Sequence, residues 1–74
     1  MSDGALKARL QVLSERTEKA LEDAHDNDAP REIVIRLAEA NAFARAVLES
    51  DELDERRLAV AIRLAEDALA LVES

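Results

Sequence analysis

Residues that interrupt helices are almost absent from this chain of 74 residues, which contains one Gly, at Gly4, and one Pro, at Pro30. Ala, Leu, Glu and Arg dominate the remaining positions, and these residues have the highest helix propensities. Loops must therefore be few and short. A chain of this length forms one small domain, and its composition predicts an all-α fold.

The first predicted helix runs from about residue 4 to residue 25, after Ser2 or Asp3 as an N-cap. Its apolar positions alternate in steps of three and four residues, which places them on one stripe about 100° wide. These positions are Leu6, Leu10, Leu13, Ala20, Leu21 and Ala24. This helix is amphipathic, with a single apolar face.

Two breaks divide the rest of the chain. Asn27 tolerates a left-handed conformation at a helix end, and Pro30 suits a first turn, so a second helix is expected over residues 30–49. A third is expected over 51–73, capped by Ser50 or Asp51. One continuous helix from Pro30 onward is the alternative, but it would bury Asp51 and Asp54. Short connections force neighbouring helices to be antiparallel, which predicts an up-down-up three-helix bundle.

The second and third predicted helices carry more apolar surface than one stripe each. The second has a main stripe and, nearly opposite, a second stripe of small and branched residues. The main stripe consists of Ile33, Leu37, Ala40, Ala44, Val47 and Leu48, and the second of Ile35, Ala38, Ala42 and Ala46. The third has one line through Leu53, Val60, Leu64 and Leu71, which Arg57 interrupts, and another about 140° away. The sequence Ile-Arg-Leu-Ala-Glu occurs at 35–39 and again at 62–66. In both copies we expect the Leu on the main stripe and the Ile on the second.

A contiguous apolar patch beyond a few hundred Å² usually marks an interface. We therefore expect helix 1 to cover one side of helices 2 and 3, and a partner chain to cover the other. The predicted interface residues are Ile35, Ala38, Ala42, Phe43, Ala46, Leu58, Ile62, Ala65 and Leu69. The alternative is a rotated bundle in which the third helix buries both of its lines, so that Ile35 and Phe43 alone stay exposed.

The composition argues against several classes of function. The net charge of −7 disfavours nucleic acids and anionic membranes. There is no Cys, and Phe43 is the single aromatic residue. The pair Glu22 and His25 occurs once and lies away from the leucine stripe, so a di-iron site is not expected. We expect no enzyme activity, no metal or other cofactor and no small-molecule ligand.

Taken over its whole length, the sequence resembles de novo designed helical bundles, in its idealised periodicity, strong helix formers and lack of Cys. The 25–30 connection, which lacks the expected Gly, and Arg57 depart from that style. The resemblance implies self-assembly or binding to a chosen target. Our expectation is a homo-oligomer, most simply a two-fold dimer. The alternative is a protein-binding module that presents the same surface to a different protein. With no targeting signal, a cytoplasmic location is expected.

Overall fold

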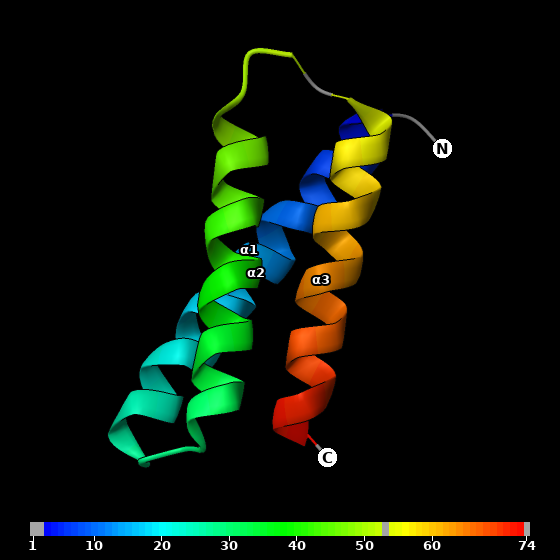
Figure 1. The fold of residues 1–74 in the computed structure, drawn as a ribbon. Helices are drawn as coiled ribbons and strands as arrows, with labels where there is room; N and C mark the ends of the chain where they lie inside the picture. Colours follow the sequence, from blue (N-terminus) through cyan, green and yellow to red (C-terminus); the bar gives the residue numbers. More distant parts are fainter. Residues whose placement is uncertain (1–2, 53, 74) are drawn as a thin grey trace.

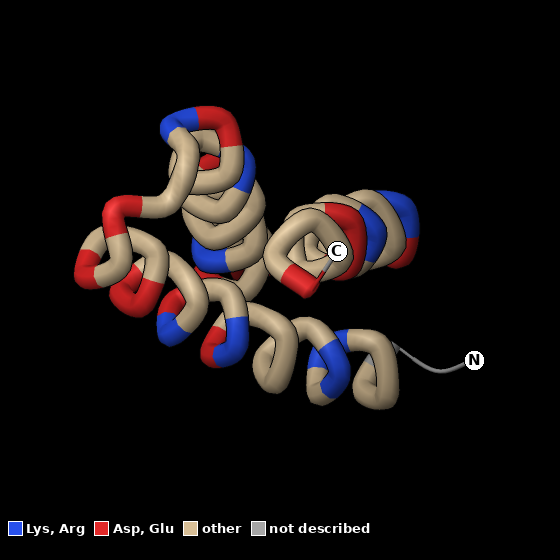
Figure 2. The backbone as a smooth tube through the Cα atoms, turned by 90° about the horizontal axis from the view of Figure 1, so that it is seen from below, with Lys and Arg blue, Asp and Glu red and all other residues tan. Residues whose placement is uncertain are grey.

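The computed structural model describes residues 3–52 and 54–73, and it shows three α-helices. Helix α1 spans Asp3–Asp26, α2 spans Arg31–Glu49 and α3 spans Glu55–Glu73. Each helix packs against both of the others, in the predicted up-down-up order (Figure 1). The bundle measures 37 × 21 × 16 Å, and α1 crosses α2 and α3 obliquely, as Figures 1 and 2 show. The predicted all-α three-helix bundle is confirmed.

The connection from α1 to α2 is a helix-ending turn with a left-handed residue. Asp28 has a positive φ of 52°, so Asp28 and not Asn27 takes the left-handed conformation. The amide of Ala29 donates to the carbonyl of Ala24 (2.9 Å), and the amide of Asp28 lies 3.5 Å from the carbonyl of His25. These two bonds define a Schellman motif, in which the left-handed position usually holds Gly.

The predicted break between α2 and α3 is confirmed, but the third helix starts later in the chain than predicted. The Ser50 hydroxyl donates to the carbonyl of Glu52 and accepts from the amide of Glu52, which makes a local turn instead of a helix cap. Asp54 is the N-cap, because its Oδ1 accepts from the amide of Arg56 at 2.9 Å. Helix α3 therefore begins at Glu55, and the predicted start near Asp51 is wrong.

The core lies between the three helices and is formed by side chains of Leu, Ala, Ile and Val. Among the described residues, the buried apolar set consists of Leu10, Leu13, Ala24, Leu37, Ala40, Ala44, Val47, Leu58, Ala61, Ile62, Ala65, Ala68 and Leu69. The buried apolar residues of α1 and α2 all belong to the main stripes predicted for the first two helices. Each large aliphatic side chain buried in this way contributes about 1.5–3 kcal/mol.

Helix α3 is rotated relative to the sequence-based expectation. In the line predicted to face a partner, Leu58, Ile62 and Leu69 are buried against α1 and α2, and Val72 near its end is 45% exposed. In the line predicted to face the core, Val60 and Leu64 are 50% and 42% exposed. Leu53 belongs to the same predicted line and lies outside the described residues. The rotated-bundle alternative is also wrong, because α3 buries one of its two lines and not both.

The repeated pentapeptide shows the rotation most directly. In α2 the Leu of the repeat, Leu37, is fully buried, and its Ile, Ile35, is 46% exposed. In α3 the order is reversed, since Ile62 is buried at 7% exposure while Leu64 is largely exposed. Identical local sequence therefore takes opposite orientations toward the core.

Alanine substitutions at these four positions test the reversal. We expect Leu37→Ala and Ile62→Ala to lower the free energy of unfolding by about 2–5 kcal/mol, because each leaves a cavity in the core. Ile35→Ala and Leu64→Ala, at exposed positions, should each change it by less than about 1 kcal/mol. Urea unfolding followed by circular dichroism measures all four. Equal losses at Ile35 and Ile62 would contradict the rotation of α3.

The left-handed residue offers a second test. Asp28→Gly should raise the free energy of unfolding by roughly 0.5–1 kcal/mol, because Gly adopts positive φ without a steric penalty. Asp26→Gly is the matched control and should destabilise the protein, since it lies within α1, where Gly is a poor helix former. Thermal unfolding of the two variants compares them, and a gain at residue 26 instead of residue 28 would contradict the turn geometry.

Candidate protein-interaction surfaces

One side of α2 points away from the core and is apolar. Its residues are spaced three or four positions apart, so they lie on one helix face, and all are exposed. We call this surface the outer face of α2, and it consists of Ile35, Ala38, Ala42 and Ala46. Ile35 is its single large side chain. This half of the predicted interface therefore lies on the surface of the bundle.

The other half of the predicted interface does not lie on the surface of the bundle. Leu58, Ile62, Ala65 and Leu69 belong to the core and are enclosed by the chain's own helices. The expectation that they face a partner is wrong, because α3 needs this line to pack on α1 and α2. Phe43 is half-buried and packs against the core from α2. The predicted site is thus reduced to the outer face of α2.

Exposed apolar side chains also occur on α3. Val60, Leu64 and Leu71 follow one side of this helix, and Asp67 interrupts their line between Leu64 and Leu71. Leu64 lies beside a small depression between α2 and α3 that Glu39 and Asp67 also line. Charged side chains therefore border this ridge closely, as Glu39 also borders the outer face of α2.

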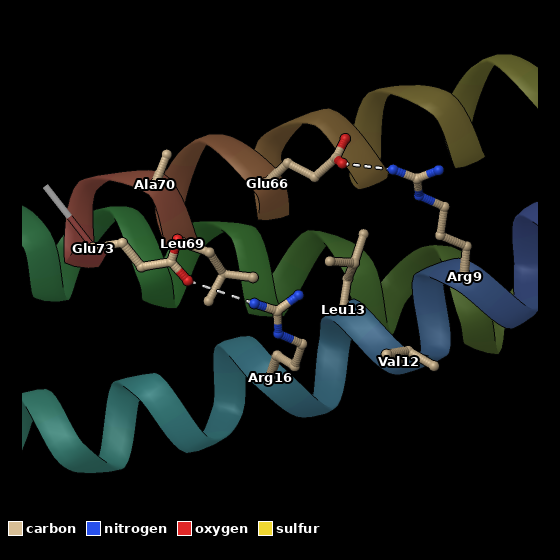
Figure 3. A pocket seen from close by; sticks show the side chains of 8 residues that line it. All are labelled: Arg9, Val12, Leu13, Arg16, Glu66, Leu69, Ala70 and Glu73. Carbon is tan, nitrogen blue, oxygen red and sulfur yellow. Dashed lines mark hydrogen bonds and ion pairs between the residues drawn. The ribbon is translucent and has the colours of Figure 1, made fainter.

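A groove runs between α1 and α3 (Figure 3). Salt bridges join the two helices at both ends of it, from Arg9 to Glu66 at 2.7 Å and from Arg16 to Glu73 at 3.6 Å. Leu13 and Leu69 lie on the apolar floor between them. We call it the α1–α3 groove, and its volume is about 440 Å³. It is lined by Arg9, Val12, Leu13, Arg16, Glu66, Leu69, Ala70 and Glu73.

The two salt bridges follow from a heptad spacing. Arg9 and Arg16 are seven residues apart, as are Glu66 and Glu73. Seven residues are close to two helical turns, so each pair lies on one side of its helix. Because the chain runs in the same direction through α1 and α3 in an up-down-up bundle, one register joins both pairs. This groove was not predicted from the sequence, and the matched heptad spacing is the signal that predicts it.

A polar contact connects α1 and α2 inside the bundle. Thr17 is fully buried, and its hydroxyl donates to the carbonyl of Ser14 at 2.9 Å. Its Oγ1 also lies 3.4 Å from Oδ1 of Asn41, which is half-buried. Asn41 therefore faces α1 and not the outer face of α2.

A candidate metal site is not found in the described part of the chain. Over residues 3–52 and 54–73, no three His, Asp or Glu side chains gather in a group that would hold a metal ion. Acidic residues are concentrated near both connections between helices and are solvent-exposed there, and Figure 2 shows several of those near the α1–α2 turn. No described helix combines the length and the hydropathy required to cross a bilayer.

Comparison with known proteins adds no relative: no family model, curated protein or solved structure matches this chain. The candidate site therefore rests on the exposed surfaces themselves. These are the outer face of α2 and the α1–α3 groove.

A double-mutant cycle on Arg9 and Glu66 measures how much their salt bridge stabilises the packing of α1 against α3. Both side chains are about half exposed, so we expect a coupling free energy of about 0.2–1 kcal/mol that decreases as salt is added. The pair of Arg16 and Glu73, which is longer and more exposed, is the matched comparison and should couple less. Chemical unfolding of each set of variants gives both values. Stronger coupling in the second pair would contradict the observed geometry.

Proposed function

We propose that this chain is a structural helical protein without enzymatic activity, and that it associates with further copies of itself. The outer face of α2 forms one side of the contact. The observation that carries this proposal is the exposure of Ile35 among three alanines, on a helix face that the chain's own core leaves uncovered.

The chemistry of this face favours a helix as the partner surface. Alanine side chains let a second helix approach closely, and Ile35 then fills the space between neighbouring side chains. Large aromatic anchors, which are typical of binding hot spots, do not occur on the outer face of α2. Packing between copies of this chain therefore fits it better than recognition of a different protein.

A designed origin, which we also propose from the style of the sequence, is compatible with this function. Designed bundles are built for assembly or for binding, and they need no catalytic group. The idealised periodicity supports this origin, whereas the lack of a side-chain N-cap hydrogen bond at the start of α2 and the left-handed conformation of Asp28 are less ideal.

The association should be weak. A standard interface buries about 800 Å² on each partner, and a face with one isoleucine and three alanines supplies less. We expect a dissociation constant of roughly 0.1 mM, which corresponds to about −5.5 kcal/mol. This is a lower affinity than the larger patch predicted from the sequence would give.

Analytical ultracentrifugation over a range of concentrations tests the proposal. The wild-type protein should increase in average mass as its concentration approaches roughly 1 mM, and Ile35→Glu and Ala42→Arg should stay monomeric because each places a charge in the apolar contact. Circular dichroism should show unchanged helicity. Val60→Glu on α3 is the matched control and should associate like the wild type. A monomeric wild type at the highest concentration would overturn the proposal.

A further inference from the structure

We propose that the α1–α3 groove is the surface that receives the outer face of α2 from a second copy of this chain. The contact is then head-to-tail, because it joins two different surfaces. This inference rests on the proposed self-association and names the second surface of that contact. The occupant that we infer is Ile35 of the second copy, seated between the two salt bridges of the groove.

The groove has the chemistry to accept an aliphatic side chain. Its floor is formed by Leu13 and Leu69, and Val12 stands beside them with 56% of its surface exposed. The salt bridges close the groove at the two ends of this apolar window, along the direction of the helices (Figure 3). An isoleucine entering here covers Val12 and leaves both salt bridges in place.

The charges on α2 match those of the groove in one orientation. Glu39 borders the side of α2 that faces α3, and Arg45 borders the side that faces α1. By the helical period, Glu32 shares the first edge and Arg31 shares the second. When the incoming α2 runs parallel to α1, its acidic edge faces the arginines of α1. Its basic edge then faces the glutamates of α3.

The spacing along the helices agrees with this orientation. Arg9 precedes Val12 by three residues and Arg16 follows it by four. Glu32 and Glu39 stand in the same relation to Ile35. Setting Ile35 level with Val12 therefore brings Glu32 level with Arg9 and Glu39 level with Arg16.

The second wall of the groove fits the same register. Arg9 pairs with Glu66, so Arg31 of the incoming helix comes within one residue of the level of Glu66. Arg45 and Glu49, the other two charges of the basic edge, both fall beyond the last residue of α3 and do not meet Glu73. Three of the four groove charges, Arg9, Arg16 and Glu66, thus come near a charge of opposite sign on the incoming helix, which favours association through complementary fields.

An antiparallel two-fold pairing of α2 with itself lacks this match. With the axis perpendicular to both helices, the acidic edge that carries Glu32 and Glu39 lies beside the acidic edge of its symmetry mate, and these like charges repel. The head-to-tail contact avoids this repulsion. It also leaves one groove and one outer face unused at the ends of every assembly, so association continues beyond a dimer.

Two single variants and their mixture distinguish the arrangements by ultracentrifugation. Val12→Glu blocks the groove and keeps the outer face of α2, whereas Ile35→Glu does the reverse. We expect each variant alone to associate at least about tenfold more weakly than the wild type. An equal mixture should form a one-to-one dimer that grows no further, because one intact groove meets one intact outer face.

Every result bears on one of the two proposals. A monomeric wild type overturns self-association and, with it, this inference. If the wild type associates and Val12→Glu associates equally well, the groove is not the receiving surface and only this inference fails. Failure of the mixture to pair also overturns it. Ala70→Lys, on the opposite wall, repeats the test if Val12→Glu loses helicity, and Val60→Glu should behave as the wild type throughout.

Discussion

The packing of α3 against the seam between α1 and α2 is the contact on which the rest of this structure depends. Helix α3 supplies three alanines and three large aliphatic residues to one broad face: Leu58, Ala61, Ile62, Ala65, Ala68 and Leu69. Small residues allow the helices to approach closely, and the large ones fill the space between them. Once this face is inside, the orientation of every other residue of α3 follows from the helical period.

That orientation determines which surfaces are available to a partner. It removes Leu58, Ile62 and Leu69 from the surface and turns Glu66 and Glu73 toward α1, where they meet Arg9 and Arg16. The groove between α1 and α3 is therefore a consequence of the same rotation that reduced the predicted interface. The outer face of α2 is unaffected, because the main stripe of α2 was assigned correctly.

Predictability differed between elements for physical reasons. Helix α1 has one apolar stripe, so its buried face was predicted well. The end of α2 was predicted at Glu49 and is found there, but the start of α3 was not predicted correctly. Ser50, Asp51 and Asp54 are all good N-cap residues, and propensity alone does not rank them. Asp54 is used because the chain between the helices first forms a turn through Ser50.

The sequence by itself determined that the chain is all-helical, where its two breaks lie and which side of α1 and α2 is buried. These properties depend on local propensity and on a single periodic stripe, and both can be read from neighbouring residues. The tertiary structure alone decided which line of α3 entered the core and that Arg9 and Arg16 meet α3. More than one face of α3 is apolar, so its own hydrophobicity does not select an orientation. The orientation of α3 is selected by how closely each of its faces packs against α1 and α2 at the same time.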